Sequence, residues 1–442
     1  MKQVGRPIIN DFRHGIALSL LALFVVFFFW SNLERLEYGF YDLGSLLRMK
    51  PASGAVSIVA IDDRSIADFG PWPWPRSYVA FMIDMLDVYG AKVIGLDIIY
   101  AGKDLNHGLR EVANIIKTIE NNPQYSRKNI STIILLSALK DAERRLDNDA
   151  ILARSITTSK RVVLPLLFDL DDKEKPSPST SYPDYLAANS VFLCPFDKSI
   201  RAAAVTVPID PFARDALRLG HINIFPDRDG VVRSENLFIR YQDRIFPSFA
   251  LQSVLAYLDM DLPDINFAQD IQIGAKKIPL VNRSMRIAFK SDIPYYEFID
   301  VINKKIPAES FRDKIVIIAP STAALGGLQE TAVAHNVPSV KVIANVIDNI
   351  LSDDYIVRPE WAAALELTMI FFFGLYIALL IPRLSAFTGG LLTSFVIFAW
   401  IGAGLYLFAV YGYWIKAVYP ALVLLMGYII IVSKRYEVAP KT

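Results

Sequence analysis

The chain has 442 residues, of which 53% are hydrophobic and 21% are charged, with a formal net charge of +1. Its mean hydropathy of +0.34 is too high for an ordinary soluble protein, yet its charged fraction is too high for one that lies wholly in lipid. The near-zero, dispersed charge disfavours a nucleic-acid partner. The single cysteine, Cys194, excludes an internal disulfide and leaves too few ligands for a zinc cluster.

Four apolar runs predict membrane-spanning helices. The first, residues 15–30, follows the basic segment 1–14, and no small-residue cleavage site comes after it, which favours an uncleaved anchor over the competing signal peptide. Three more runs of about the length needed to cross a bilayer lie near the other end, at residues 361–381, 386–410 and 417–432. The sequence therefore predicts one span before and three spans after a large polar segment.

The basic flanks of these runs predict the orientation. With the basic N-terminus in the cytoplasm, Arg383 and Lys434 also fall on that side, and only Lys416 disagrees. We therefore expect residues 31–360 to form a periplasmic domain of a multi-pass protein in the bacterial inner membrane, with the tail 433–442 returning to the cytoplasm.

The outer segment begins with a pattern typical of an α/β fold. Two apolar runs, residues 56–62 and 91–100, flank a predicted helix whose apolar face includes Val79, Met82 and Leu86. Continuous apolar strands indicate burial on both faces, and a helical crossover favours a parallel, right-handed pair. The predicted fold class is α/β and mixed, with a largely parallel core.

Further elements follow along the outer segment. Residues 171–181 are of low complexity and are expected to form a solvated loop. The remaining patterns predict buried strands over 131–139, 160–168 and 313–321, an antiparallel pair over 230–246, and helices over 147–158, 248–258 and 337–354.

Two motifs carry a resemblance to a known family. They are Pro-Trp-Pro-Arg at residues 73–76 and Asp-Arg-Asp-Gly-Val-Val-Arg at 227–233, and they precede the runs "DKIVIIAPS" and "VKVIANVIDNIL" in that order. Together they resemble the second type of CHASE domain, the sensory extracellular module associated with cyclases and histidine kinases. The resemblance covers nearly the whole outer segment, and three spans after the domain are usual in that family.

The resemblance implies a receptor that senses an unidentified ligand or partner and signals through its spans. We expect a homodimer in the lipid bilayer, acting on a cytoplasmic output domain in cis or in trans, since residues 433–442 are too few to fold as one. The competing interpretation is a structural or assembly subunit of a cell-envelope complex. No catalytic fingerprint, cofactor motif or metal spacing is present, so we expect neither an enzyme nor a cofactor in this chain.

The segment "GPWPWPRS", residues 70–77, predicts a rigid hinge. Its alternating prolines exclude helix and central strand and favour an extended link before the next helix. We expect Trp74 to be a buried wedge close to the helix start, and Trp72 to be the more exposed indole that could face a ligand.

Strand-end acids beside this hinge define the candidate ligand site. Asp62, Asp63 and Asp97 come at the carboxyl ends of the first two predicted strands, the edge at which open α/β sheets commonly bind ligands. We expect them to converge there with the two indoles and Arg76. The acids could also hold Mg²⁺ or serve in phosphoryl transfer, or they could cap the following helix.

The second motif gives one more candidate, Arg233, which could bind an anion or pair with a nearby acid. The preceding "PDRDG" superficially resembles a calcium loop. Counting from Asp227, however, the twelfth position is Phe238, which has no oxygen ligand in its side chain. We therefore predict a turn there and no metal.

Overall fold

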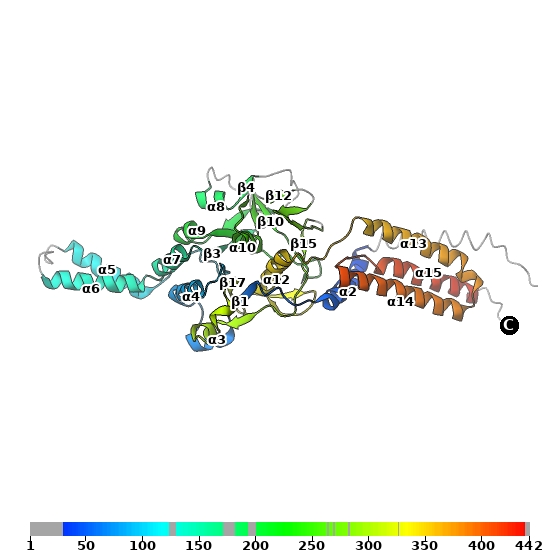
Figure 1. The fold of residues 1–442 in the computed structure, drawn as a ribbon, viewed down its shortest axis with the longest axis horizontal. Coiled ribbons are helices and arrows are strands. Elements are labelled where there is room, and N and C mark those ends of the chain that lie inside the picture. Colours follow the sequence, from blue (N-terminus) through cyan, green and yellow to red (C-terminus); the bar gives the residue numbers. More distant parts are fainter. Residues whose placement is uncertain are drawn as a thin grey trace, which may run out of the picture.

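The chain forms an elongated molecule with three parts in a row (Figure 1). A central α/β body carries a helical hairpin at one end and a bundle of long helices at the other. The computed structural model describes residues 30–122, 130–170, 182–192, 200–262, 265–267, 270–281, 283–325 and 327–437.

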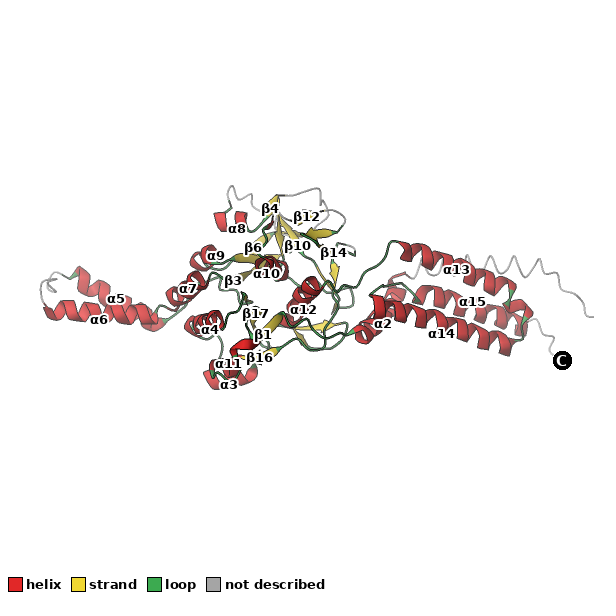
Figure 2. Cartoon of the chain, viewed as in Figure 1, coloured by secondary structure: helices red, strands yellow, loops and turns green. Residues whose placement is uncertain are grey.

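A seven-stranded sheet forms the centre of the body (Figure 2). The strand order is β16–β1–β17–β2–β3–β6, and β7 also pairs with β3. Every pairing in it is parallel except that of β3 with β6. The strands are β1 (Val56–Ile61), β2 (Val93–Leu96), β3 (Val162–Asp169), β6 (Ala204–Thr206), β7 (Arg218–His221), β16 (Tyr295–Glu297) and β17 (Ile315–Pro320).

The first strand shows why its sequence is apolar at all positions but Ser57. Val56, Ile58 and Ala60 enter the core on one face of the sheet, whereas Val59 and Ile61 enter the core on the other. Side chains alternate between the two faces of a strand, so a strand covered on both sides is apolar nearly throughout, and the buried Ser57 donates to the carbonyl of Ser310 at 3.3 Å. The predicted largely parallel α/β core is present.

Four helices pack on the two faces of the sheet. On one face lie α4 (Arg76–Val88) and α7 (Asn148–Ser159), and on the other lie α10 (Phe249–Leu258) and α12 (Ser339–Ser352). The apolar positions predicted to face the core in α4, including Val79 and Met82, are fully buried. The core on the α12 side continues to the helical bundle at the end of the molecule, because it also contains Tyr41, Phe408 and Trp414.

The lateral order of the strands differs from the simplest expectation. β1 and β2 are parallel, but they are not neighbours, because β17 lies between them: Ile317 pairs with Ile58 on one side and with Gly95 on the other. The order of strands along the chain does not fix their order across a sheet, since a long crossover can insert a late strand.

The strand predicted over residues 131–139 is wrong. These residues lie within α6 (Ile130–Leu146), which pairs with α5 (His107–Asn121) in the hairpin at the far end of the molecule (Figure 1). Ile133 and Ile134 are exposed rather than buried. A short apolar run does not distinguish a strand from a helix, and this helix continues for seven residues beyond the end of the run.

Smaller elements complete the body. The antiparallel pair predicted over 230–246 is present as β10 (Phe238–Tyr241) with β11 (Arg244–Pro247). Cys194 and the low-complexity loop lie outside the described residues. The remaining short strands and helices are α3 (Asp63–Phe69), α8 (Asp184–Ala188), β4 (Val191–Phe192), β5 (Ile200–Ala202), α9 (Asp210–Asp215), β8 (Val231–Val232), β9 (Ser234–Glu235), β12 (Ile265–Phe267), β13 (Ile271–Ile273), β14 (Lys276–Ile278), β15 (Met285–Arg286), α11 (Phe298–Ile302), β18 (Leu328–Thr331) and β19 (Val337–Pro338).

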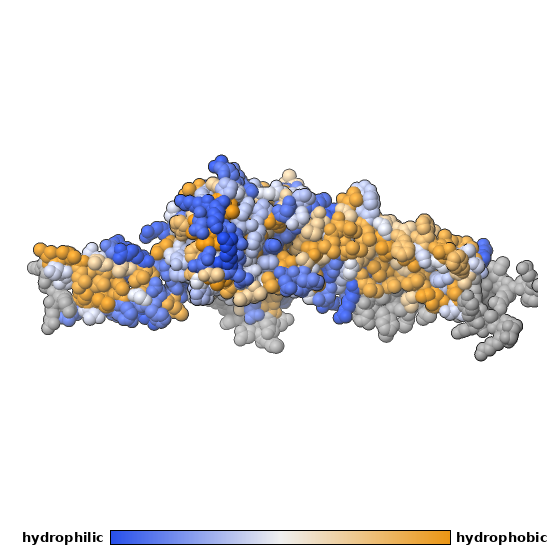
Figure 3. All heavy atoms as spheres, turned by 90° about the horizontal axis from the view of Figure 1, so that it is seen from below, coloured by the Kyte–Doolittle hydropathy of each residue, from blue (hydrophilic) through white to orange (hydrophobic). Residues whose placement is uncertain are grey.

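The bundle contains α13 (Trp361–Leu379), α14 (Ala386–Tyr411) and α15 (Val418–Glu437), with α2 (Trp30–Arg48) at the end facing the body. Among the described residues, Trp361–Arg383 and Ala386–Tyr411 are long and apolar enough to cross a membrane, and the apolar part of α15 is shorter. Figure 3 shows hydrophobic residues over this bundle and also on the distant hairpin. The predicted first span lies outside the described residues, apart from residue 30.

Candidate functional site

A cavity of about 520 Å³ opens at the carboxyl edge of the central sheet. Three parallel strands end at it, because Asp97 follows β2, Pro320 ends β17 and Ile222 follows β7. Open α/β sheets bind ligands at this edge, in pockets that are largely apolar with a few polar groups. The lining residues are Trp72, Asp97, Ile98, Ile99, Leu167, Ile222, Asn223, Ile224, Pro320, Leu325, Gln329, Ser339 and Ile343.

Asp97 is the one ionisable side chain among the described residues that line this cavity. Its backbone N–H donates to the carbonyl of Ile318 at 2.9 Å, which fixes the residue at the end of the strand ladder. Its carboxylate has no hydrogen-bond or ion-pair partner among the described residues. Burial raises the pKa of this carboxyl to about 7, so near neutral pH it can either donate or accept a hydrogen bond.

Three amide and hydroxyl side chains add polar groups to the lining, and their partners hold them in place. Asn223 accepts from the N–H of Phe168 and donates to its carbonyl, at 2.9 and 2.7 Å. On the opposite wall, Gln329 donates to Ser339, the first residue of α12, at 3.1 Å. A small ligand that presents a hydrogen-bond donor to Asp97 and an apolar face to the remaining lining fits this cavity.

The proline hinge contributes one of its two indoles to the cavity. Trp74 is 4% exposed, packs on Phe69 and Phe298, and donates from its indole to the carbonyl of Gly70 at 2.8 Å. Trp72 is half-buried, contacts Trp74 edge-on at 5.4 Å and lines the cavity. As predicted, Trp74 is the wedge and Trp72 is the more exposed residue.

The other predicted residues of this edge do not join Asp97 and Trp72 in the cavity lining. Asp62 is the N-cap of α3 and accepts from the N–H of Ser65 at 3.1 Å, while Asp63 is exposed on the first turn of that helix. Arg76 is buried and paired with Asp149 at 2.5 Å. Its guanidinium lies 4.6 Å from the ring centre of Tyr100, so it holds α4 to the chain beyond β2. Asx capping and structural pairing account for these three residues.

Arg233 does not line this cavity and instead links the body to α2. It is 1% exposed, and its guanidinium binds Asp42 of α2 at 2.6 and 2.7 Å and Asp229 at 2.8 and 2.9 Å. Asp227 completes the cluster at 3.3 Å. Burial alone would lower the pKa of this guanidinium, but its carboxylate partners outweigh burial and raise it. The pairing alternative is therefore the one found for Arg233.

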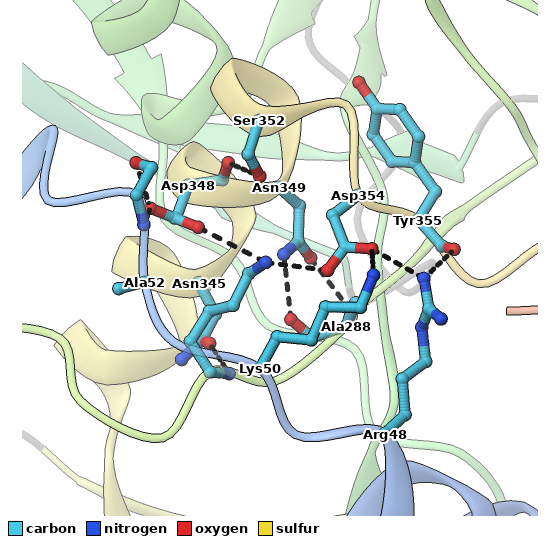
Figure 4. A network of polar contacts seen from close by, with 12 residues as sticks. Arg48, Lys50, Ala52, Ala288, Asn345, Asp348, Asn349, Ser352, Asp354 and Tyr355 are labelled. Atoms are coloured by element: carbon cyan, nitrogen blue, oxygen red, sulfur yellow. Dashed lines mark hydrogen bonds and ion pairs between the residues drawn. The ribbon is translucent and has the colours of Figure 1, made fainter. Parts of the chain in front are cut away.

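Helix α12 connects the cavity to a second polar cluster (Figure 4). Its first turn supplies Ser339 to the cavity, and Asp354, just beyond its last turn, accepts from three cations: Arg48 at 2.5 Å, Lys290 at 2.7 Å and Lys50 at 3.0 Å. Burial alone would raise the pKa of Asp354, but the hydrogen bonds from the lysines and the charge of Arg48 outweigh it and lower the pKa. The helix is about 21 Å long at 1.5 Å per residue.

Two amides on α12 fix the helix to the neighbouring strand segment. Asn349 accepts from the N–H of Ala288 and donates to its carbonyl, both at 2.8 Å, and Asn345 accepts from the N–H of Lys290 at 2.7 Å. These buried amides satisfy backbone groups that no strand pairs. Helix α12 and the segment around Lys290 therefore form one tightly bonded unit.

Helix α2 connects this unit to the bundle. Arg48, in addition to binding Asp354, donates to the carbonyls of Ala409 and Val410 in the last turn of α14, at 3.3 and 3.4 Å. Glu37 accepts from the N–H groups of Val418 and Tyr419 at the start of α15, at 2.7 and 3.1 Å. Helix ends attract opposite charges, so α2 binds α14 at its C-terminus and α15 at its N-terminus.

Several of these residues could not be found from the sequence. Asn223, Gln329 and Ser339 reach the cavity from segments far apart along the chain, and the partner of Arg233 on α2 is 191 positions away. The strand-end position of Asp97 was the available signal for the cavity. Among the described residues, no group of three or more His, Cys, Asp or Glu could hold a metal ion.

The chain thus combines a largely parallel α/β core, a cavity at the carboxyl edge of its sheet, and helices that connect this core to an apolar bundle. The chain belongs to the CHASE2 domain family, whose model matches residues 20–379. This is an extracytoplasmic sensor domain of signal-transduction proteins. No curated protein and no solved structure matches the chain.

Proposed function

We propose that the chain is the sensory and transmembrane part of a receptor in the bacterial inner membrane. In this proposal a periplasmic ligand binds in the cavity at Asp97, and four spans with cytoplasmic termini transmit the change to an effector in the same polypeptide or in a partner protein. The basic flanks of the apolar runs support this orientation, and the two long apolar helices support the membrane placement.

The observation that carries the proposal is the position of α12. One end of the helix lines the cavity with Ser339 and Ile343, and the other end leads directly to Asp354 in the cluster with Arg48. A packed helix transmits displacement along its length, because close-packed interiors do not absorb it locally. Movement at the cavity would therefore reach α2 and, through it, the ends of α14 and α15.

A ligand would act through the ionisation state of Asp97. A bound donor or cation favours the carboxylate, which burial otherwise disfavours, so the empty and occupied cavities differ in charge at the edge next to α12. A ligand shifts a receptor only by its differential affinity for two states. The unpartnered carboxylate is a group whose interactions differ between those states.

A chimera with a reporter kinase fused after Thr442 tests the proposal. We expect Trp72→Phe at the cavity and Asp354→Asn at the far end of α12 both to change kinase output in membranes. The matched control is Lys140→Gln, which removes an exposed ion pair with Glu120 on the distant hairpin. Unchanged output in both test variants, with normal membrane levels, would refute the coupling.

Reporter fusions test the orientation independently. Alkaline phosphatase inserted within residues 171–181 should be active, and the same enzyme fused at the C-terminus should be inactive. The reverse pattern would place the sensor domain in the cytoplasm and end the receptor proposal.

The alternative is a structural or assembly subunit, and the hairpin of α5 and α6 is the observation that favours it. The hairpin extends from the body, and Ile130 and Ile134 on it are 73% and 64% exposed. Large exposed apolar residues gathered together are typical of protein contacts. If this surface carries the function, Ile134→Ser will change the phenotype and Trp72→Phe will not. Homodimer formation, expected for the receptor, can be measured by ultracentrifugation in detergent.

A further inference from the structure

A second cavity, of about 440 Å³, lies between the body and the bundle. Its walls come from both parts. Glu34 and Tyr38 belong to α2, Trp414 and Lys416 to the link between α14 and α15, and the rest to the body or to the segment before α13. The lining residues are Glu34, Tyr38, Phe225, Pro226, Asp227, Arg228, Ser234, Asn236, Ser284, Arg286, Arg358, Trp414 and Lys416.

The position of this cavity corresponds to one surface of the membrane. Arg358 stands just before the apolar helix that begins at Trp361, and Trp414 follows shortly after the one that ends at Tyr411. Trp361 and Tyr411 are exposed there, and both rings lie 5.9 Å from that of Tyr413. Exposed aromatic residues at helix ends are typical of the headgroup level of a bilayer.

Two buried donors in the lining have no partner. The Nε of Arg286 and the indole Nε1 of Trp414 make no hydrogen bond among the described residues, although the two residues are only 7% and 5% exposed. Buried donors are rarely left without an acceptor, because each costs the free energy of its lost hydration. The guanidinium of Arg286 lies 5.2 Å from the ring centre of Trp414, so these two side chains of the lining pack against each other.

The charges of the lining are mixed. It contains four basic residues, Arg228, Arg286, Arg358 and Lys416, and two acids, Glu34 and Asp227. The pairs of Arg286 with Asp227 and of Arg228 with Glu34 are long, at 3.2 and 3.4 Å. The pair of Arg358 with Glu366, outside the lining, is closer at 2.9 Å.

Both signs of charge at one site match a zwitterion better than a simple anion. A phosphate group would accept from the buried donors and the basic residues, while an ammonium group would meet Glu34, Asp227 and the ring of Tyr38. Inorganic phosphate would bring negative charge next to Glu34 and Asp227 without an ammonium group of its own to meet them.

From this we infer that the second cavity binds the headgroup of a zwitterionic phospholipid, with a phosphodiester near Arg286 and Trp414 and an ammonium near Glu34. The inference rests on the proposed membrane placement of the bundle but not on ligand binding at Asp97. A lipid bound there would contact the body, α2 and the link between α14 and α15 at once.

Native mass spectrometry of the full-length chain, released from detergent, tests this inference. The probes are phosphatidylethanolamine, phosphatidylglycerol, soluble phosphoethanolamine and inorganic phosphate. We expect retention of phosphatidylethanolamine, with about tenfold weaker retention in Trp414→Phe and in Arg228→Gln, as the loss of one hydrogen bond to a charged group predicts. Trp414→Phe keeps an aromatic ring but leaves a smaller side chain in the core, whereas Arg228 is largely exposed, so Arg228→Gln tests the site without disturbing the core and the melting temperature of Trp414→Phe is measured alongside.

The control is Arg214→Gln, a comparable loss of an exposed ion pair on the body, which should retain lipid like the wild type. Equal retention of phosphatidylethanolamine in both cavity variants would overturn the inference, and so would equal binding of phosphatidylglycerol. Inorganic phosphate that displaces the lipid would show a free-phosphate site instead. Flotation with liposomes separates the two proposals: failure to float refutes the membrane placement, whereas flotation without lipid retention refutes only the headgroup site.

Discussion

Two aspartates near the two ends of α12 differ in their polar partners. Asp97, at the cavity, has no partner among the described residues, and burial raises the pKa of its carboxyl to about 7. Asp354, at the far end, accepts from three cations, which lower its pKa despite burial. A paired charge holds two elements together, while an unpaired one is available to a ligand. In the proposed function, the same residue type therefore serves attachment at one end of α12 and ligand recognition at the other.

One of the two largest expected effects comes from removing the charge of Asp354 at the attached end of α12. Asp354→Asn leaves Lys290 and Arg48 with less compensation in a buried site and should lower the free energy of unfolding by about 3 kcal/mol, as the loss of one member of a buried ion pair does. Denaturant unfolding of the full chain in detergent measures it.

The matched control is the adjacent residue, Asp353, whose ion pair with Lys276 is more exposed. Asp353→Asn should change stability by less than about 1 kcal/mol. Equal effects of the two substitutions would show that the cluster in Figure 4 does not hold α12.

A second prediction concerns the wedge next to the recognition end. Trp74→Ala should lower the unfolding free energy by about 3 kcal/mol, because it empties a packed site against Phe69 and Phe298. Function would then be lost through unfolding. A Trp74→Ala protein that keeps the wild-type melting temperature would show that the hinge is not part of the core.

The third prediction uses the raised pKa of Asp97. Between about pH 4 and pH 7 the unfolded state ionises this carboxyl while the folded state keeps its proton, so wild-type stability falls as the pH rises through this window. Asp97→Asn removes that loss. Because the side chain is partly exposed, we expect the variant to be more stable at pH 8 by on the order of 1 kcal/mol, and unchanged near pH 4.

Melting temperatures at intervals from pH 4 to pH 8 measure this effect, with the exposed acid Asp63 as the control in Asp63→Asn. Glu235 is buried, and burial raises its pKa to about 8, so it gives a slope of the same sign in all three proteins. Parallel curves for wild type and Asp97→Asn would show that this carboxyl is not desolvated.

The smallest stability effect should come from Trp72→Phe. Phenylalanine replaces the half-buried indole with another aromatic ring, so the free energy of unfolding should stay within about 1 kcal/mol of the wild-type value. The output of the kinase chimera should nevertheless change. A large loss of stability would instead make Trp72 a second wedge and weaken its assignment to the cavity.

The sequence predicted those features that depend on local pattern. The apolar face of α4, the buried strands β1 and β17, and the different environments of Trp72 and Trp74 all follow from periodicity or proline chemistry. It could not predict what depends on distant pairing. The position of β17 between β1 and β2, and the reach of Arg233 to Asp42, are set by how the chain returns on itself.

The candidate site shows the same division. Strand-end chemistry led to Asp97, and the hinge led to Trp72, whereas the expected convergence with Asp62, Asp63 and Arg76 was not found. Each of those three is explained by a nearby requirement: a cap for α3, an exposed first turn, and a partner for Asp149. Most polar residues near the site cap helices or form ion pairs within the fold, and a sequence does not show which ones are left to bind a ligand.

The two attachments of α2 have a mechanical consequence. Glu37 and Arg48 stand about 16 Å apart along the helix, and they grip opposite ends of two helices that run in opposite directions. Because α2 is bound to α14 through Arg48 and to α15 through Glu37, it cannot move at one of these contacts without moving at the other. A displacement of Arg48 by Asp354 would therefore tilt α2 and also displace the start of α15. Leu43→Pro would kink α2 between the two contacts. Both contacts would remain, but a displacement of Arg48 would no longer reach the start of α15.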